Sequence, residues 1–510
     1  MSQHAPIQSP LPLSSLLKGI VEVDAANDCN IHGLAIDSRE VARGDLFIAC
    51  RGINTDGARY VADAIAAGAV AVVVEGDDDV ATATHPVPVI RVGELQNRLG
   101  LIASRFFSSP SQQLFVVGVT GTNGKTSCCH FLAQALQLNG KKCGVIGTLG
   151  YGLAGALQPA THTTPNPVVL QSQLRAIRDA GAAEVVMEVS SHALAQGRVA
   201  GVAFDVALFT NLTRDHLDYH GDFEAYGAAK QKLFAMPGLS HAVINRDDPF
   251  GVQLLASLPL GVKAVVYGLV DRAQFDALDE VGVYGQMTAL DESGIEMRVA
   301  TPKGAGVLRS EHLLGEFNAR NLLAVLAVLL LMDVTLERAL GLLAQVRNAA
   351  GRMERLGGEG LQPLVVIDYA HTPDALQNVL NALRGHCRGR LWCLFGCGGD
   401  RDSGKRPLMG TVATQYADVV VITDDNPRNE DAVAIVRDIT AGISSDSLQG
   451  EEVRVIHDRA AAIDYAVRRA SADDVVVIAG KGHEQYQLIG EQRLPFSDRD
   501  CAQMILQEVA

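Results

Sequence analysis

The stretch from Val116 to Thr126, VVGVTGTNGKT, sets the organisation of this chain. The apolar run 114–119 predicts a buried strand, and residues 127–138 have the pattern of a helix. A glycine-rich turn between a strand and a helix presents backbone N–H groups and the positive helix end to an anion. Lys125 can reach outer phosphates, and the Thr126 hydroxyl can bind Mg²⁺. The stretch therefore predicts a site for a nucleotide phosphate.

The spacing of this stretch departs from the strict P-loop pattern, which has a glycine five residues before Gly124. Val119 occupies that position, so we expect Gly121 to make the tight turn instead. A glycine-rich turn that binds no nucleotide is the alternative. The order of strand, turn and helix favours ATP.

Length and composition describe a large globular protein. A chain of 510 residues exceeds what one core can organise and suggests about three domains. The net charge of −15 disfavours a nucleic-acid partner, and the longest apolar stretch, 322–332, is too short to span a membrane. No secretory signal is visible, and nine scattered cysteines favour a reducing cytoplasm. We therefore expect neither zinc nor disulfides.

Strand-like and helix-like segments alternate along the chain, which predicts an α/β fold with mainly parallel sheets. We expect a small α/β domain over 1–108, a central P-loop domain over 109–347 and a doubly wound domain over 348–510. A turn at 108–111 and a glycine-rich hinge at 348–363 mark the boundaries, and 266–306 predicts a β-rich insertion. Strands are predicted at 44–49, 70–74, 87–92, 114–119, 143–147, 184–189, 206–209, 241–244, 364–369, 391–396, 418–423, 453–457 and 474–479.

Polar segments follow the predicted strands, where the ligand crevice of a parallel sheet lies. In the central domain Glu188 and His216 stand at strand ends, and Mg²⁺ favours the carboxylate over the imidazole. By itself, His216 is more often a hydrogen-bonding loop residue. Lys230 by itself is an ordinary solvated helix lysine.

Four polar segments end strands of the third domain, at 368–374, 396–402, 424–428 and 480–484. Arg401 and Arg428 can bind a carboxylate, and neighbouring acids can bind an ammonium group, so a zwitterion is a suitable ligand. Surface charge on loops would explain any one segment. Four such segments at strand ends weaken that explanation.

Taken together and in order, these segments resemble the Mur ligases. The matching motifs are GTNGKT (121–126), EVSSHAL (188–194), FTNLTRDHLDYHG (209–221), GRME (351–354), DYAHTPDAL (368–376), FGCGGDRDSGKRP (395–407), DDNPR (424–428) and GKGHE (480–484). They span essentially the whole chain. The resemblance is strongest to the branch that adds meso-diaminopimelate to UDP-N-acetylmuramoyl-L-alanyl-D-glutamate, in bacterial peptidoglycan synthesis.

The resemblance implies a three-domain, cytoplasmic and monomeric ligase. Its first domain would hold the UDP end of one substrate, its P-loop ATPase domain would bind ATP, and a Rossmann-like C-terminal domain would bring the amino acid. ATP would phosphorylate the D-glutamyl γ-carboxylate, and the amine would attack the acyl phosphate. The partners would be ATP, the UDP-muramoyl dipeptide and meso-diaminopimelate, with no nucleic acid and no membrane span.

The resemblance also implies roles for individual residues. The ATP-binding set is Gly121, Thr122, Asn123, Gly124, Lys125, Thr126, Asn318, Asn321, Arg352, Asp368 and His371. The set for the UDP-linked substrate is Ile36, Ser38, Asn54, Thr55, Thr163, Thr164, Ser190, Gln196 and Arg198. The set for diaminopimelate is Arg401, Asp425, Asn426, Pro427, Arg428, Gly480 and Glu484.

For catalysis the resemblance implies Lys125, Lys230 and His216, with Mg²⁺ held by Thr126, Glu188, His216 and Lys230. Lys230 would be carbamylated by CO₂, which turns a cation into an oxygen anion that suits Mg²⁺. Arg428 would bind the second carboxylate, which diaminopimelate has and lysine lacks. His162 and Pro165 to Pro167 differ from some relatives, so the contacts of Thr163 and Thr164 are the least secure part of the resemblance.

Three alternatives follow from the same residues. Folylpolyglutamate synthetase shares the P-loop and the acyl-phosphate chemistry but lacks a first domain of this kind and the DNPR segment. A lysine-adding ligase would differ at few positions. A nucleotide-dependent binding module would hydrolyse ATP without forming a ligated product.

Overall fold

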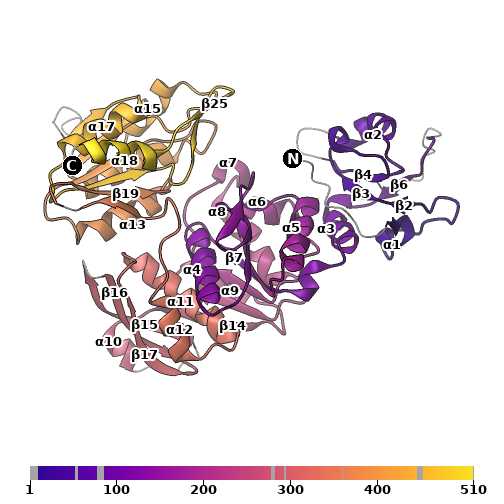
Figure 1. The fold of residues 1–510 in the computed structure, drawn as a ribbon, viewed down its shortest axis with the longest axis horizontal. Helices are drawn as coiled ribbons and strands as arrows, with labels where there is room; N and C mark the ends of the chain where they lie inside the picture. Colours follow the sequence, from indigo (N-terminus) through magenta and orange to yellow (C-terminus); the bar gives the residue numbers. More distant parts are fainter. Residues whose placement is uncertain are drawn as a thin grey trace. The chain divides into compact units, whose positions relative to one another are not determined.

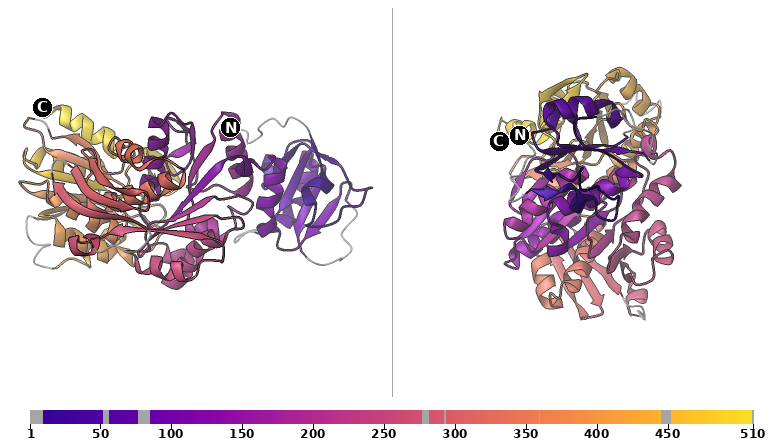
Figure 2. Two further views of the ribbon diagram at one scale, coloured as in Figure 1. Left: turned by 90° about the horizontal axis from the view of Figure 1, so that it is seen from below. Right: turned by 90° about the vertical axis from the view of Figure 1, so that its right-hand side faces the viewer.

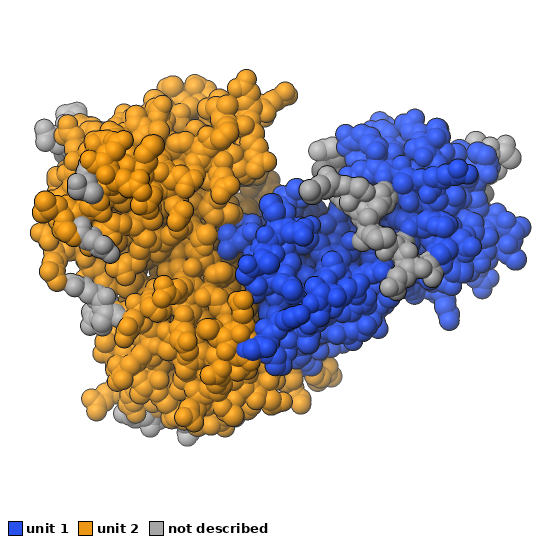
Figure 3. All heavy atoms as spheres, viewed as in Figure 1, with its two compact units in different colours: residues 1–118, 140–207, 232–240 blue, residues 119–139, 208–231, 241–510 orange. Residues whose placement is uncertain are grey.

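The computed structural model describes residues 10–51, 56–76, 85–276, 282–291, 294–358, 360–444 and 452–508. The chain divides into two compact units, coloured separately in Figure 3. The first holds Met1–Gly118, Gly140–Ala207 and Lys232–Ser240, and the second holds Val119–Asn139, Leu208–Gln231 and His241–Ala510. Both units take part of the predicted central domain, so the domain boundaries near 108 and 347 stay predictions.

The first unit begins with a four-stranded parallel sheet in the order β3-β4-β5-β6 (Figures 1 and 2). Its strands are β3 (Gly33–Ala35), β4 (Asp45–Ala49), β5 (Ala71–Glu75) and β6 (Val89–Val92). Side chains alternate between the two faces, so Val72 packs with α2 (Val61–Ala67), whereas Val73 packs with α1 (Leu13–Leu17) and α3 (Leu95–Phe106). Helices therefore cover both faces of this sheet, as parallel sheets require.

Further strands of the first unit run in the order β10-β9-β8-β11. They are β8 (Cys143–Gly147), β9 (Gly150–Leu153), β10 (Ala156–Gln158) and β11 (Glu184–Glu188). β8 and β11 pair in parallel, whereas β9 and β10 form an antiparallel hairpin. Helix α5 (Pro167–Asp179) begins after Asn166, whose side-chain oxygen accepts a hydrogen bond from Val169 N, and Pro167 occupies its first turn.

Strands β7 (Phe115–Thr120) and β12 (Val206–Phe209) begin in the first unit and end in the second. In the second unit the order continues with β13 (His241–Asn245), β14 (Lys263–Leu269), β15 (Gly282–Asp291), β16 (Gly294–Thr301) and β17 (Gly304–Ser310). The first three of these pair in parallel, and β15, β16 and β17 form an antiparallel meander. Helix α11 (Glu316–Leu331) is apolar on nearly all sides because it packs against α4 (Lys125–Leu138), β13, β14 and β15.

The last part of the second unit is a six-stranded sheet in the order β18-β19-β23-β20-β21-β22. The strands are β18 (Glu354–Gly357), β19 (Leu364–Asp368), β20 (Leu391–Phe395), β21 (Val419–Ile422), β22 (Val453–Val455) and β23 (Val475–Ala479), and only the edge strand β18 is antiparallel. One face carries α13 (Pro373–Arg384), α14 (Lys405–Tyr416) and α15 (Ala432–Thr440). The other carries α17 (Arg459–Arg469) and α18 (Asp498–Glu508). The fold is therefore doubly wound, and the loops after β19, β20, β21 and β23 meet at one edge.

Each strand that the sequence predicts lies within two residues of an observed strand. The apolar stretch 322–332 lies almost wholly in helix α11, which begins earlier, at Glu316, with a first turn that carries polar residues. The sequence misses two short hairpins, β9–β10 and β24 (Tyr486–Ile489)–β25 (Gln492–Pro495). β25 is wholly exposed and β24 only partly buried, so neither has the apolar alternation that marks a strand.

All nine cysteines are free thiols. Within the described ranges, no helix has the length and apolar character that crossing a membrane needs.

A buried ion pair joins the helices α17 and α18. Arg459 Nε and Nη2 donate to the two carboxylate oxygens of Asp498 at 2.7 and 2.8 Å, and both side chains are fully buried. Arg459 Nη2 also donates to the carbonyl of Ala479 at the end of β23, at 3.0 Å. The pair therefore connects both helices to the strand end where the GKGHE segment begins.

Replacing Asp498 with alanine should lower the free energy of unfolding by about 3–5 kcal/mol, because it leaves the buried Arg459 charge unpaired. Denaturant unfolding of the full chain measures this. Asp464→Ala, which removes one of the two exposed carboxylate partners of Arg468, is the matched control and should leave the unfolding midpoint almost unchanged. Similar shifts for both variants would contradict the importance of the buried pair.

Candidate active site

The turn between β7 and α4 has room only for glycine at Gly121. Its φ is +145°, and a Cβ atom there would lie 1.9 Å from the Thr210 hydroxyl oxygen. Gly124, with φ of +86°, precedes the first residue of α4. Gly121 thus makes the tight turn that Val119 cannot, and the backbone N–H groups of the first turn of α4 begin directly after Gly124.

The segment after β12 holds this turn from one side. The Thr210 hydroxyl donates to the carbonyl of Asn123 at 2.6 Å, and Asn211 Oδ1 accepts from Asn123 N at 2.9 Å. The Thr122 hydroxyl oxygen accepts from Thr213 N at 3.0 Å and lies 3.1 Å from the Tyr226 hydroxyl. Because both ends of the turn are bonded, its shape is fixed before any ligand arrives.

Two lysines meet at the carbonyl oxygen of Gly121. Lys125 Nζ donates to it at 2.8 Å and to the Thr122 carbonyl at 2.8 Å, and Lys230 Nζ donates to it at 2.9 Å. Lys230, on α8 (Phe223–Gln231), is buried and lies over the Tyr226 ring. Burial lowers the pKa of Lys230 well below its usual range, Lys125 lowers it further, and Asp215 opposes the shift. The lowered pKa favours the neutral amine of Lys230 more than that of a solvated lysine.

A buried carboxylate, Asp215, gathers three basic side chains. His216 Nε2 lies 3.4 Å, His371 Nε2 3.6 Å and Lys405 Nζ 3.9 Å from its oxygens. Burial opposes the ionisation of Asp215, but His371, His216 and Lys405 together hold the pKa of its carboxyl far below its usual range. Asp215 therefore remains an anion that links the segment after β12 to the loops after β19 and β20.

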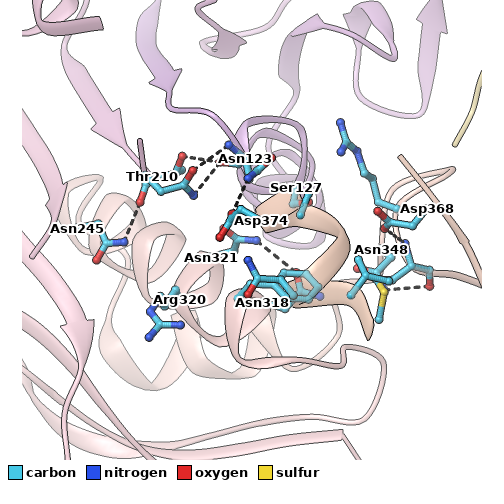
Figure 4. Close-up of a pocket in the computed structure, with 18 of the residues that line it drawn as sticks. Asn123, Ser127, Thr210, Asn245, Asn318, Arg320, Asn321, Asn348, Asp368 and Asp374 are labelled. Atoms are coloured by element: carbon cyan, nitrogen blue, oxygen red, sulfur yellow. Dashed lines mark hydrogen bonds between the residues drawn. The ribbon is translucent and has the colours of Figure 1, made fainter. Parts of the chain in front are cut away.

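A pocket of the second unit lies beside the P-loop (Figure 4). Six residues of the predicted ATP-binding set line it: Asn123, Gly124, Asn318, Asn321, Arg352 and Asp368. Asn123 Nδ2 donates to Asp374 at the start of α13 at 2.9 Å, and Arg352 Nη2 donates to the Thr126 hydroxyl at 3.3 Å. The P-loop, α11 and the loop after β19 therefore contribute to one site.

The GRME segment enters this pocket through a strained backbone. Met353 has φ of +49°, and its N–H donates to Asp368 Oδ2 at 2.7 Å. Arg352 lies over the Tyr369 ring, with its guanidinium carbon 4.6 Å from the centroid. Burial raises the pKa of Asp368, while Arg352 and two backbone N–H groups oppose the shift. Asp368 thus fixes the backbone that aims Arg352 at Thr126.

The amino-acid residues predicted in the third domain gather at the edge formed by β20, β21 and β23. Arg428, with φ of +52°, donates from Nη1 to the Gly399 carbonyl at 2.7 Å, and Gly399 N donates to the Asn426 carbonyl at 2.9 Å. Asn426 Nδ2 donates to Glu484 at 2.9 Å. Within the described ranges the Arg428 guanidinium makes this one hydrogen bond, which leaves Nε and Nη2 for a carboxylate.

The other predicted residues of this set lie around the same loops. Gly480 N donates to the Asp368 carbonyl at 3.1 Å, and Gln487 Nε2 donates to the Asp425 carbonyl at 2.7 Å. Arg401 is exposed and donates to the carbonyl of its neighbour Asp400. Pro427 follows Asn426 in the loop. Acidic and basic groups therefore lie at one sheet edge, as a zwitterion requires.

A separate cavity of about 900 Å³ lies in the first unit. Four residues predicted to bind the UDP-linked substrate line it: Ile36, Ser38, Gln196 and Arg198. His162, Pro165 and Pro167, from the loop that departs from some relatives, line it too. A cavity of this size suits a nucleotide or sugar ligand.

Thr164 and Ser190, two of the remaining described residues of that set, are joined to the cavity by hydrogen bonds. Arg198 Nη1 donates to the Thr164 carbonyl at 2.9 Å, and Ser190 N donates to the Thr164 hydroxyl oxygen at 3.1 Å. The Thr163 hydroxyl lies 3.0 Å from that of Thr148. Asn54 and Thr55 lie outside the described residues.

Glu188 ends β11 as a buried carboxylate. Its Oε1 accepts from Thr148 N at 2.8 Å and its Oε2 from the Thr148 hydroxyl at 3.2 Å. Among the described residues, no three His, Cys, Asp or Glu side chains form a metal-binding group. A divalent cation would therefore need other ligands in addition to a carboxylate, such as the Thr126 hydroxyl or a modified lysine. Those oxygen donors suit Mg²⁺ better than they suit zinc.

Sequence reasoning missed several residues of these sites. Thr210, Asp215 and Asp374 stand inside the quoted motifs, so closer attention to each motif residue would have found them. Tyr267 and Asn378 also line the P-loop pocket, but they stand in no motif and carry no local signal. His371, which we expect at ATP, lies with its Nε2 3.6 Å from a carboxylate oxygen of Asp215, and its role at ATP stays a prediction.

Three family models match the chain in succession. They are described as "Mur ligase family, catalytic domain" over residues 30–107, "Mur ligase middle domain" over 119–329 and "Mur ligase, glutamate ligase domain" over 351–482. The parallel sheets, the P-loop and these matches together define the class of protein, an α/β ligase that uses ATP. The chain belongs to the Mur ligase family.

Two similar sequences and one similar solved structure carry the same name. The UDP-N-acetylmuramoyl-L-alanyl-D-glutamate--2,6-diaminopimelate ligase of Ectopseudomonas mendocina is 52% identical over 489 residues, which cover 96% of each chain. That of Pseudomonas aeruginosa is 49% identical over 482 residues, 94% of this chain and 96% of the relative. A solved structure of an enzyme of that name superimposes with a TM-score of 0.69 at 35% identity, over 98% of this chain and 99% of the other.

Replacing Lys230 with methionine should raise the free energy of unfolding at neutral pH. The lowered pKa means that the unfolded chain binds a proton that the folded chain excludes, so the lysine destabilises the fold below its ordinary pKa. This penalty shrinks as the pH approaches 10.5, and so should the gain in Lys230→Met. Denaturant unfolding at pH 7 and pH 9.5 in bicarbonate-free buffer measures both.

The exposed Lys232, two positions along the chain, provides the control. Lys232→Met should change stability little at either pH. A loss of stability in Lys230→Met that is the same at both pH values would contradict the neutral-amine interpretation.

Proposed function

We propose that this protein ligates meso-diaminopimelate to the D-glutamyl γ-carboxylate of UDP-N-acetylmuramoyl-L-alanyl-D-glutamate, using ATP. The observation that carries the proposal is the common edge at which Arg428, Asn426 and Glu484 lie, in a chain about half identical to enzymes of that name. The product would be the tripeptide precursor of bacterial peptidoglycan.

The phosphate end of the reaction would use the P-loop. A carboxylate is a poor electrophile, so transfer of the γ-phosphoryl group of ATP to the γ-carboxylate makes an acyl phosphate. Lys125 and Arg352 would offset the charge of the migrating group, since both side chains lie at the start of α4. Asn318, Asn321 and Asp374 would hold the remainder of the nucleotide in the pocket.

The amine end would use the edge of the third domain. The incoming amine attacks the acyl carbon, a tetrahedral intermediate forms, and phosphate leaves as the amide appears. Arg428 would bind the carboxylate of diaminopimelate that lysine lacks, and Glu484 would bind the ammonium group beside it. The cavity of the first unit would hold the UDP-linked substrate through Ile36, Ser38 and Arg198.

Mg²⁺ would be held by Thr126 and Lys230, with His216 as a further candidate, and would supply charge neutralisation at the phosphates. Glu188 is a candidate ligand from the family resemblance alone. Thr126 and Glu188 offer hard oxygen donors, and the neutral amine of Lys230 can attack CO₂ to form a carbamate with release of a proton. ¹³C-bicarbonate should give a carbamate resonance that disappears in Lys230→Arg. An unchanged spectrum in that variant would exclude the modification.

The reaction would take place in the cytoplasm, where ATP is available and thiols stay reduced; the nine free cysteines support this. The chain would act as a monomer.

The decisive experiment combines ATP, Mg²⁺ and UDP-N-acetylmuramoyl-L-alanyl-D-glutamate with either meso-diaminopimelate or L-lysine, and follows phosphate release and product mass. We expect ligation of diaminopimelate. Ligation of lysine alone would support the acyl-phosphate reaction but refute the proposed specificity for diaminopimelate. Phosphate release without a ligated product would favour a nucleotide-dependent binding module.

Replacing Arg428 with alanine should raise the KM for meso-diaminopimelate by at least about tenfold, because the second carboxylate loses a charge-assisted pair. The KM for ATP should stay within about twofold. Arg401→Ala, which removes the exposed arginine of the neighbouring loop, is the comparison and should have the smaller effect. Equal changes in both Michaelis constants for Arg428→Ala would contradict the assignment.

A further inference from the structure

Lys481 is a fully buried lysine at the edge where the proposed amino-acid site lies. It follows β23 and Gly480, and its side chain has no exposed surface. Its Nζ donates to Glu484 Oε2 at 3.0 Å and to Asn426 Oδ1 at 3.1 Å, and lies 5.6 Å from the centroid of the Tyr486 ring. A buried ammonium group is costly unless it is paired, so this lysine calls for a physical explanation.

The three side chains form a closed triangle. Asn426 Nδ2 donates to Glu484 Oε2 at 2.9 Å, and Asn426 Oδ1 also accepts from Leu488 N at 2.9 Å. The opposite amide orientation would set its NH₂ group against two donors, Lys481 and Leu488 N. Lys481 therefore fixes both the Asn426 amide and the Glu484 carboxylate.

The triangle also supports the loop that carries Arg428. Arg428 N donates to the Leu488 carbonyl at 3.0 Å, and Gly490 N donates to the Arg428 carbonyl at 2.7 Å. Leu488 lies on β24, so that strand is bound to Asn426 through its N–H and to Arg428 through its carbonyl. Lys481 is thus linked directly to Glu484, and through Asn426 and Leu488 to the backbone of Arg428.

The positive charge of Lys481 also changes the electrostatics of the proposed amino-acid site. Glu484 alone would be an unpaired anion that attracts any ammonium group, whereas the Lys481–Glu484 pair is neutral. meso-Diaminopimelate has two ammonium and two carboxylate groups, so its net charge is zero. L-Lysine lacks one carboxylate and has a net positive charge, so Lys481 and Arg428 repel it more than they repel diaminopimelate.

We propose that Lys481 is a positioning and specificity-determining residue, which orients Asn426 and Glu484 and keeps the pocket from attracting lysine. This inference rests on the proposed function. Under this proposal the discrimination between diaminopimelate and lysine depends on two cations, the buried Lys481 and the partly buried Arg428. Arg428 attracts the second carboxylate of diaminopimelate. Lys481 neutralises the charge of Glu484, which would otherwise favour L-lysine, an amine that lacks this carboxylate.

The test measures kcat and KM of the full chain for meso-diaminopimelate, L-lysine and ATP. Lys481→Met should lower the ratio of kcat/KM for diaminopimelate to kcat/KM for lysine by about tenfold or more, the effect of one charge several ångströms away at an effective dielectric constant near 20. The KM for ATP should stay within about twofold. Lys481→Gln removes the charge and keeps hydrogen bonding, and should lower the ratio similarly.

A control separates specificity from stability. Ile505→Ala opens a cavity in the core of the same domain and changes no charge, so it should leave the ratio unchanged even if it lowers stability. An unchanged ratio in Lys481→Gln, or an equal rise of every Michaelis constant in Lys481→Met, would overturn the proposal. If Lys481→Met does not fold, Lys481→Gln decides. Failure of the unsubstituted chain to ligate diaminopimelate would instead refute the proposed function.

Discussion

The close approach of Gly121 to Thr210 is the constraint on which the rest of the site depends. A side chain at position 121 would collide with the Thr210 hydroxyl, which is itself hydrogen-bonded to the Asn123 carbonyl. The turn can therefore pack against the segment after β12 only with glycine at this position. That fit brings Lys125 and Lys230 to one carbonyl oxygen and sets the start of α4 beside Asn318 and Asn321 of α11. The phosphate site is therefore fixed by backbone packing before a ligand contributes.

Buried charge recurs at the functional edges. Lys230, Asp215 and Lys481 are each nearly or fully buried, and each is kept by a small set of polar partners. Such groups lower the stability of the fold unless they are paired, and well-packed apolar side chains in their place are often at least as stable. Lys230 lies at the P-loop, Asp215 follows β12, and Lys481 follows β23. The buried ion pair Arg459–Asp498 lies at the end of β23 as well, where it connects two helices to the sheet.

Much of the fold follows from local pattern. Apolar runs bounded by glycine or polar residues give the strands, because a strand that is buried on both faces needs consecutive apolar side chains, as Val475 to Ala479 have. The polar segments at the strand ends are equally visible, and the parallel topology brings them together. The partly buried β24 strand cannot be recognised in this way, although it holds Asn426 and Arg428, because it binds them through backbone groups that any residue carries.

The sequence by itself determined the α/β class, the order of the strands along the chain, the P-loop and the residue types at each strand end, because these depend on local periodicity and on motif spacing. Only the tertiary structure decided that β23 lies between β19 and β20, that His371 faces Asp215, and that Lys481 bonds to both Asn426 and Glu484. The physical reason is that burial and charge pairing are properties of neighbours distant in the chain. A lysine after a strand has the same local pattern whether it is solvated or enclosed.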